Sequence, residues 1–485
     1  MDTAQLLRRL ASQGAMIERL SCDSRRCSPG AAFLAYPGEA ADGRMHIADA
    51  IGRGASAVLW DDAGFAWRAQ WRVPNIAVRD LRQHAGLLAH DFYGRPSESL
   101  WICGVTGTNG KTSCSQWIAA ALSASGAKAG VIGTLGAGFP GALAELPNTT
   151  PDALEVHRIL KDLQVQGAKA AAMEVSSHGL VQGRVNGVAF DCALFTNLSH
   201  DHLDYHGSME AYAEAKARLF DSPGLSAAVL NMDDVVGVQL ARRLEERGIR
   251  VIGYSLSGVR NASREFIAAA RSTSGEMDLE SSWGHATARV NQLGRFNLAN
   301  ALGVLGCLVA HGMPFEQAIE HLAQLPPVPG RMEPVGERPL AVIDYAHTPD
   351  ALEKVLQALR PVVAQRGGSL VAVFGAGGDR DPAKRPLMGS VAARLADRIV
   401  VTSDNPRSEA PLDIISQVAK GIDRPHEIEA DRAHAIELAI SQAHASDVVL
   451  IAGKGHESYQ EIAGRRLPFS DAQVARRALA RRGDA

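Results

Sequence analysis

The stretch "GVTGTNGKTS" at residues 104–113 follows the apolar run "LWICGV" (100–105) and precedes the helix-forming run "CSQWIAAALSA" (114–124). A strand, a glycine-rich turn, a Lys-Thr pair and a helix in this order are typical of a loop that binds polyphosphate. Gly107 and Gly110 would let backbone N–H groups turn toward phosphate oxygens, and the helix would offer its positive N-terminal end. The stretch therefore predicts a phosphate loop at the end of a strand.

Three side chains around this loop suit ATP chemistry. Lys111 would reach the β- and γ-phosphates, and the hydroxyl of Thr112 would ligate Mg²⁺. Glu174 ends the apolar run "AAAMEV" (170–175), where a carboxylate can ligate Mg²⁺ beside the phosphates. Val105 stands in the place of the first glycine of the strict motif, so an incidental lysine in a strand-to-helix turn stays open as an alternative.

The rest of the chain is predicted to be α/β with three domains. Apolar runs that end near polar or glycine residues, with helical segments between them, indicate parallel sheets covered on both faces. A proline cluster at 325–339 predicts a linker, and four further apolar runs after it indicate a second doubly wound domain, Rossmann-like in type. We therefore expect a small N-terminal α/β domain at 1–90, a central phosphate-loop domain at 91–325 and a C-terminal α/β domain at 326–485.

Composition narrows the class of protein. The 485 residues are 46% hydrophobic and 21% charged, and the formal net charge of -3 disfavours a nucleic-acid partner. The N-terminus has no apolar core like that of a signal peptide, and no run reaches the ~18 apolar residues of a membrane span. Six scattered cysteines without a CxxC pair are expected to be free thiols. A cytoplasmic location is the resulting expectation.

Two further stretches leave their function open when they are taken alone. The loop "TNLSHDHLDYHG" (196–207) is rich in histidine and aspartate, but Tyr205 stands where a metallo-β-lactamase-type motif needs histidine, so a polar loop with one useful histidine is favoured over a three-ligand zinc site. In the helical stretch "MEAYAEAKARLF" (209–220), Lys216 is expected to be an exposed structural lysine.

Taken together, the motifs resemble the Mur ligases, most closely those that add meso-diaminopimelate to UDP-N-acetylmuramoyl-L-alanyl-D-glutamate. The matching motifs occur in family order over nearly the whole chain: "DSR" (23–25), "GTNGKTS" (107–113), "NTTPD" (148–152), "MEVSSHGL" (173–180), "TNLSHDHLDYHG" (196–207), "EAKARLF" (214–220), "GRFNLANALG" (294–303), "PGRME" (329–333), "DYAHTPDALE" (344–353), "DNPR" (404–407) and "GKGHE" (453–457). A chance match on this scale is implausible.

The resemblance implies an ATP-dependent amide ligase of peptidoglycan precursor synthesis that works as a cytoplasmic monomer. ATP would phosphorylate a substrate carboxylate, and the amine of the incoming amino acid would attack the acyl phosphate. Two Mg²⁺ ions would assist, and Lys216 would be carbamylated, which reverses the expectation drawn from its helix alone. The implied catalytic residues are Lys111, Lys216 and His202, and the implied metal ligands are Thr112, Glu174, His202 and the carbamate of Lys216.

The resemblance also implies a binding role for each group of motif residues. ATP would contact Gly107, Thr108, Asn109, Gly110, Lys111, Thr112, Ser113, Asn300, Arg331, Asp344 and His347. The UDP-substrate would contact Cys22, Ser24, Glu39, Ala40, Ala41, Asn148, Thr149, Thr150, Ser176, Gln182 and Arg184. Diaminopimelate would contact Arg380, Asp404, Asn405, Pro406, Arg407, Gly453 and Glu457. Arg407 would grip the far carboxylate of diaminopimelate, a group that lysine lacks.

The chain departs from the family pattern at the uridine end. The run "EAA" (39–41) stands where relatives often carry "HQA", and Cys22 replaces an apolar residue. Three alternatives remain: a lysine-adding Mur ligase, a ligase like folylpolyglutamate synthetase, and a non-catalytic ATP-binding scaffold. The N-terminal "DSR" motif and "DNPR" argue against the second, and the carboxylates and Lys216 in their family places argue against the third.

Overall fold

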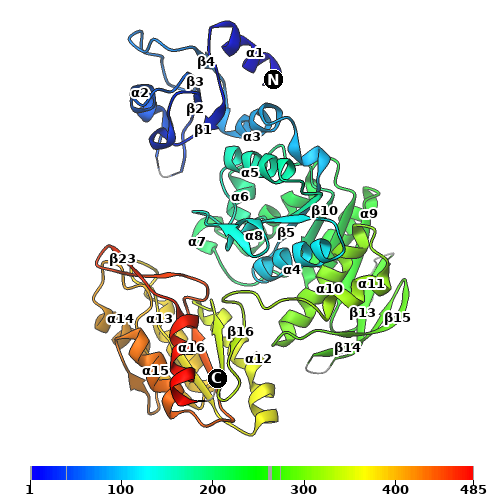
Figure 1. Cartoon of the computed structure of the whole chain (residues 1–485), viewed down its shortest axis with the longest axis vertical. Helices are drawn as coiled ribbons and strands as arrows, with labels where there is room; N and C mark the ends of the chain where they lie inside the picture. Colours follow the sequence, from blue (N-terminus) through cyan, green and yellow to red (C-terminus); the bar gives the residue numbers. More distant parts are fainter. Residues whose placement is uncertain (1–2, 40, 260–264, 273–274, 484–485) are drawn as a thin grey trace. The chain divides into compact units, whose positions relative to one another are not determined.

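The computed structural model describes residues 3–39, 41–259, 265–272 and 275–483 (Figure 1). The chain forms two compact units. The first comprises 1–268, 281–284 and 302–318, and the second comprises 269–280, 285–301 and 319–485. Both units are α/β, which confirms the predicted fold class.

The N-terminal part of the first unit has a sheet of its own. Its four parallel strands lie in the order β1-β2-β3-β4. They are β1 (Arg19–Ser21), β2 (Ala31–Ala35), β3 (Ala57–Trp60) and β4 (Asn75–Ala77), and the helices around them are α1 (Thr3–Ser12), α2 (Ile47–Gly52) and α3 (Leu81–Phe92). Strands β2 and β3 are buried along their whole length, and separate apolar cores form with Leu34 in one and Phe33 in the other. This continuous burial explains why these strands are apolar without alternation.

The central sheet of the first unit carries the phosphate loop. Strand β5 lies between β10 and β9, and the order through this part is β12-β11-β10-β5-β9-β6-β7-β8. The strands are β5 (Trp101–Thr106), β6 (Ala129–Gly133), β7 (Gly136–Phe139), β8 (Ala142–Ala144), β9 (Ala170–Glu174), β10 (Cys192–Phe195), β11 (Ala227–Asn231) and β12 (Arg250–Ser255). Because β5, β9 and β10 are parallel, the loops that follow them leave the same edge of the sheet.

Helices alternate with these strands as the apolar runs predicted. They are α4 (Lys111–Ala124), α5 (Ala153–Val165), α6 (Ser177–Val181), α7 (Leu203–His206), α8 (Met209–Ala217) and α9 (Val235–Glu246). The chain continues through β13 (Glu265–Ser272), β14 (Glu276–Ser281), β15 (Gly284–Arg289), α10 (Arg295–Ala310) and α11 (Phe315–Leu322). Asp152 caps α5 by accepting hydrogen bonds from the backbone N–H groups of Leu154 and Glu155, which fixes where the loop before α5 ends.

The second unit contains a six-stranded sheet in the order β16-β17-β21-β18-β19-β20, in which only β16 is antiparallel to its neighbour. Its strands are β16 (Glu333–Val335), β17 (Leu340–Asp344), β18 (Leu370–Phe374), β19 (Arg398–Val401), β20 (Glu427–Ile428) and β21 (Val448–Ala452), and a hairpin adds β22 (Tyr459–Ile462) and β23 (Arg465–Pro468). Its helices are α12 (Pro349–Arg366), α13 (Lys384–Leu395), α14 (Pro411–Ala419), α15 (Arg432–Gln442) and α16 (Asp471–Arg482). This arrangement confirms the second doubly wound sheet.

One sequence expectation, on the linker, changes in detail. The stretch 325–339 was predicted to be a linker, but it contains β16, because Glu333, Pro334 and Val335 pair with β17. The N-terminal and central parts, which were predicted to be separate domains, have separate sheets within the first unit. Among the described residues, no helix combines the length and the apolar character needed to cross a bilayer.

Candidate active site

The phosphate loop joins β5 to α4, as the sequence predicts. Gly107 and Gly110 have backbone φ angles of +144° and +88°, in the region that favours glycine. A Cβ on Gly107 would lie 1.9 Å from the hydroxyl oxygen of Thr196, so the loop also needs glycine for space. The Lys111 Nζ atom donates hydrogen bonds to the carbonyl oxygens of Gly107 and Thr108, each at 2.9 Å. The lysine ammonium therefore lies over the loop that would hold phosphate.

The buried carboxylate of Glu174 joins two segments beside this loop. Thr112 donates its hydroxyl to Glu174 Oε2 at 3.0 Å, and Thr134 donates its hydroxyl to the same oxygen at 3.1 Å. The Thr134 backbone N–H donates to Glu174 Oε1 at 2.8 Å. Glu174 is 1% exposed, and a Cβ on Gly133 would lie 2.2 Å from its Oε1 atom. The strand-end position of Glu174 was predicted, but Thr134 was missed.

This set of oxygen atoms fits Mg²⁺. Mg²⁺ prefers hard oxygen ligands and usually binds to one or two carboxylates together with substrate phosphates. The Thr112 hydroxyl and the Glu174 carboxylate lie together at the start of α4, next to the phosphate loop. The residues present therefore suit the ion that the resemblance implies.

Lys216 was expected from its helix to be an exposed structural lysine, and this expectation is wrong. Its side chain is 1% exposed, on α8. The Nζ atom donates a hydrogen bond to the Gly107 carbonyl oxygen at 2.8 Å and lies 4.3 Å from the centre of the Tyr212 ring. Burial, reinforced by repulsion from Lys111, lowers the pKa of Lys216 well below its ordinary value. The lysine therefore belongs to the phosphate-loop site.

His202 is the N-cap residue before α7 and has a left-handed backbone conformation with φ of 53°. Its Nε2 atom lies 3.5 Å from a carboxylate oxygen of Asp201. Partial burial lowers the pKa of His202, which favours the neutral imidazole that can act as a metal ligand. The ring of His206 stacks on the Tyr212 ring of α8, with 4.9 Å between the ring centres. One histidine of this loop is thus placed near the two lysines, whose charges contribute to its pKa shift.

The residues predicted for the muramoyl-peptide path form a connected chain. The Thr149 and Thr134 hydroxyls lie 3.0 Å apart, and Thr150 donates to Ser176 Oγ at 3.1 Å. Arg184 donates to the Thr150 carbonyl oxygen at 2.8 Å and to Gln182 Oε1 at 2.8 Å. Of the predicted set, Asn148 is exposed on the same loop. The chain of contacts leads from the surroundings of Glu174 toward the N-terminal sheet.

The uridine-end residues are brought to this path only in part. Cys22 is half-buried, and burial together with the nearby Asp152 carboxylate raises the pKa of its thiol to about 12. Ser24 is buried in a 3₁₀ turn, and Ala41 is exposed. Ala40 lies outside the described residues.

Glu39 has partners that the sequence did not reveal. It accepts hydrogen bonds from Gln182 Nε2 and from the Tyr205 hydroxyl, each at 2.6 Å. Arg82 lies 3.4 Å from the same carboxylate. These contacts join the loop after β2 to α6 and α7, which places Glu39 beside the predicted substrate residues.

The ATP candidates beyond the phosphate loop lie in the second unit. Buried Asp344 ends β17 and accepts hydrogen bonds from the backbone N–H groups of Met332 and Ala346, each at 2.8 Å. Burial raises the pKa of Asp344. The Arg331 guanidinium lies 4.6 Å from the Tyr345 ring centre. Of the other two candidates, His347 is exposed and Asn300 is buried on α10.

The amino-acid candidates converge at the ends of β19 and β21. Lys454, which is fully buried, donates to Asn405 Oδ1 and to Glu457 Oε2, each at 2.9 Å, and Asn405 Nδ2 donates to the same Glu457 oxygen at 2.8 Å. A Cβ on Gly453 would lie 2.3 Å from Asp404 Oδ2. Lys454 was missed because a lysine between two glycines gives no sign that it is buried.

Arg407 follows buried Pro406 and has a positive φ of 52°. Its guanidinium donates to the Gly378 carbonyl oxygen and lies 3.9 Å from Glu461. A Cβ on Gly377 would lie 3.1 Å from Arg407 Nη1 and 3.7 Å from Arg380 Cγ, so the two arginines border the same glycine. The Arg407 guanidinium beside this glycine suits a ligand with a carboxylate.

Three family models match the chain in order. They are the catalytic domain of the Mur ligase family over residues 16–93, the Mur ligase middle domain over 105–308, and the Mur ligase glutamate ligase domain over 330–455. The phosphate loop, Glu174 and Lys216 lie within the middle-domain match, and the Arg407 and Lys454 loops lie within the glutamate ligase match.

Full-length relatives are similar to this chain over almost their whole length. The UDP-N-acetylmuramoyl-L-alanyl-D-glutamate–2,6-diaminopimelate ligase of Chromobacterium violaceum is 51% identical over 97% of this chain and 96% of its own, and that of Pseudomonas aeruginosa is 50% identical with the same coverage. A solved structure of a ligase with this name is 38% identical, has a TM-score of 0.68 and is covered over 96% of its length. Folylpolyglutamate synthase of Mycobacterium tuberculosis, 19% identical with a TM-score of 0.62, shares the fold. The chain belongs to the Mur ligase family.

Proposed function

We propose that this protein is the ATP-dependent ligase that joins meso-diaminopimelate to UDP-N-acetylmuramoyl-L-alanyl-D-glutamate in peptidoglycan precursor synthesis. The observation that carries the proposal is Arg407, which borders Gly377 together with Arg380 and follows the buried residues 404–406. Full-length relatives that are about half identical, 51% and 50% in the two cases above, carry the name of this activity.

The first half-reaction would take place at the phosphate loop. The γ-phosphate of ATP and the substrate carboxylate are both negative, so their approach requires cations that neutralise the developing charge. Lys111 would contact the phosphates, while Thr112 and Glu174 would hold one Mg²⁺ and His202 would help to hold a second. Mg²⁺, when bound, supplies Lewis-acid stabilisation to the phosphate oxygens. The remaining ATP contacts would come from Thr108, Asn109, Ser113, Asn300, Arg331, Asp344 and His347.

Lys216 would take part as a carbamate. A buried lysine amine that contacts a carbonyl oxygen and an aromatic ring lacks the setting of an ordinary surface cation. Addition of CO₂ to this amine would turn it into a carboxylate-like ligand, which suits a metal ion beside phosphate. Its contact with Gly107 places it on the loop that would hold the nucleotide.

The second half-reaction would join the two substrates. The connected residues from Thr149 to Arg184 would hold the muramoyl-peptide so that its terminal carboxylate meets the γ-phosphate, and Cys22, Ser24 and Glu39 would contact the uridine end. Asn405, Glu457 and Asp404 would orient the amine of diaminopimelate for attack on the acyl phosphate, and phosphate would then leave the tetrahedral intermediate. All three sets of residues come from one chain, so we propose a monomer, and the nucleotide-linked substrate leads us to propose the cytoplasm.

The direct test is phosphate release by the purified protein with ATP and Mg²⁺. Release should require both UDP-N-acetylmuramoyl-L-alanyl-D-glutamate and meso-diaminopimelate. Lys111→Ala should lower turnover by about 100-fold or more while leaving the melting temperature near that of the wild type, because it removes a charge from the phosphate site. Absence of phosphate release under every substrate combination would instead support the scaffold alternative, and release with L-glutamate and a folate would support the synthetase alternative.

A further inference from the structure

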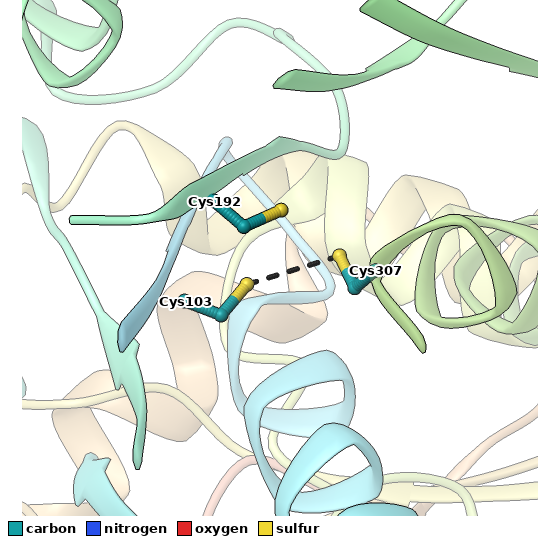
Figure 2. A group of neighbouring side chains, drawn as sticks. All are labelled: Cys103, Cys192 and Cys307. Atoms are coloured by element: carbon teal, nitrogen blue, oxygen red, sulfur yellow. Dashed lines mark hydrogen bonds between the residues drawn. The ribbon is translucent and has the colours of Figure 1, made fainter. Parts of the chain in front are cut away.

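Three cysteine thiols meet inside the first unit (Figure 2). Cys103 lies on β5, Cys192 on β10 and Cys307 on α10, and all three are 0% exposed. Their sulfur atoms all lie within 4.8 Å of one another, and the sulfurs of Cys103 and Cys307 are 3.8 Å apart. Within the described ranges, this is the one group of three or more His, Cys, Asp or Glu side chains close enough to share a metal ion.

The fold accounts for the meeting of these residues. Cys103 and Cys192 are directly paired in the register of neighbouring parallel strands, so their side chains leave the same face of the sheet. The helix that covers this face approaches unusually closely, since a Cβ on Gly306 would lie 2.7 Å from a methyl carbon of Val229. The close approach brings Cys307, the residue after Gly306, next to the two cysteines on β5 and β10. Three distant parts of the chain thus supply one sulfur each.

The sulfur separations suit three-coordinate binding. A buried cysteine is often simply a small apolar residue, and three cysteines could pack in that way. Three sulfurs bound to one trivalent arsenic atom by bonds of about 2.3 Å, in a pyramid with angles of about 100°, would lie about 3.5 Å apart. The Cys103–Cys307 separation of 3.8 Å is close to this value, and side-chain rotations would bring all three sulfurs into range.

The complete burial of the three sulfurs favours a bound group with no net charge. Burial of an unpaired charge is costly. Three thiolates carry three negative charges, so a divalent ion would leave one charge uncancelled, whereas a trivalent ion would cancel all of them. Burial raises the pKa of the Cys307 thiol well above its ordinary value, so the thiol enters the reaction neutral. Arsenous acid is also neutral and is small enough to enter during local opening of the fold.

We propose that Cys103, Cys192 and Cys307 form a three-sulfur binding site for trivalent arsenic. Arsenous acid, As(OH)₃, would react with the three thiols so that three As–S bonds form while three As–O and three S–H bonds break. Three water molecules leave, and the product is the neutral As(SR)₃ group. No electrons are transferred, so the step needs no oxidant or reductant.

Arsenic bound to the three sulfurs would link β5, β10 and α10 in the folded protein. A ligand that binds the folded state more tightly than the unfolded state raises the melting temperature. The unfolded chain also offers thiols, but it does not hold three of them together. The folded protein should therefore retain arsenic in a defined ratio and should be stabilised by it.

The test uses the reduced full-length protein with sodium arsenite as the probe. After desalting, native mass spectrometry should show one arsenic atom per chain with the loss of three protons, and the melting temperature should rise. Cys307→Ala should lower the affinity for arsenite by at least tenfold and should abolish the rise. Cys27→Ala and Cys114→Ala serve as matched controls, because both residues are buried cysteines outside the group, and both variants should bind as the wild type does.

Three outcomes would overturn the proposal. They are the absence of retained arsenic in the wild type, equal retention in Cys307→Ala, and a melting temperature lowered by arsenite, which would indicate binding to the unfolded chain. If Cys307→Ala fails to fold, X-ray absorption of the wild-type arsenic adduct gives the number of sulfur neighbours around arsenic and so tests the site. Three sulfur neighbours around arsenic would support the site, and two or fewer would contradict it.

Discussion

The Thr112 hydroxyl donates a hydrogen bond to the Glu174 carboxylate over 3.0 Å, which joins the first turn of α4 to the end of β9. This pair places a hydroxyl and a carboxylate at one point beside the phosphate loop. We expect Glu174→Gln to lose most ligase activity, because an amide is a poor Mg²⁺ ligand. Thr134→Val, which removes one hydrogen bond to Glu174, should raise the Mg²⁺ concentration for half-maximal activity by about 10-fold or more. Mg²⁺ titrations of both variants check this, and unchanged Mg²⁺ dependence in both would exclude Glu174 from the metal site.

Carbamylation of Lys216 predicts chemical rescue. Lys216→Ala should be nearly inactive, and added formate or acetate should restore part of the activity by filling the vacated ligand position. Lys111→Ala is the matched control, because it removes the neighbouring lysine, whose role requires a positive charge, so small carboxylates should not rescue it. Removal of CO₂ should also lower wild-type activity. Equal rescue of both variants would point to a general salt effect instead of a missing ligand.

Buried His157 predicts a loss of stability in acid. Its Nε2 atom lies 3.0 Å from the Asn186 carbonyl oxygen, and burial lowers its pKa from 6.5 to about 4. Between these two pKa values the His157 imidazole binds a proton in the unfolded state but stays neutral in the folded state. The free energy of unfolding should therefore fall as pH drops from 6.5 to 4, and this group should contribute at most about 1.4 kcal/mol per pH unit. His157→Gln should flatten this part of the curve in urea unfolding, whereas exposed His46→Gln should not. The same slope in His157→Gln would remove this residue as the cause.

Lys454 is predicted to position the amino-acid site. Its two hydrogen bonds hold Asn405 and Glu457, so Lys454→Met should release both side chains. A hydrogen bond to a charged group contributes about 1.5–3 kcal/mol, so its loss would raise KM for the amino acid by roughly 10- to 150-fold. KM for ATP should stay near the wild-type value. The exposed Lys420→Met on the same unit is the control. A parallel rise of both KM values would indicate general damage to the fold.

The sequence predicted the parts of the site that depend on local order along the chain. The phosphate loop, the strand-end position of Glu174 and the second doubly wound sheet all follow from apolar runs and the residues that end them. Thr134 and Glu174 are 40 residues apart and meet only because β6 pairs with β9, which no local pattern encodes. The burial of Lys216 was missed for a similar reason, since its partner Gly107 is 109 residues away. Resemblance to the family, and not helix periodicity, assigned Lys216 to the site.

The central claim is the choice of amino acid, and kcat/KM for meso-diaminopimelate and for L-lysine tests it most directly. Arg407 offers the far carboxylate of diaminopimelate a partner, and lysine brings no second carboxylate to that guanidinium. We predict that the wild type prefers diaminopimelate by at least roughly 10- to 150-fold, the range expected for hydrogen bonds to a charged group. Arg407→Ala should lose most of this preference without gaining activity on lysine. Comparable wild-type values for the two amino acids would contradict the assignment, even though membership of the Mur ligase family would stand.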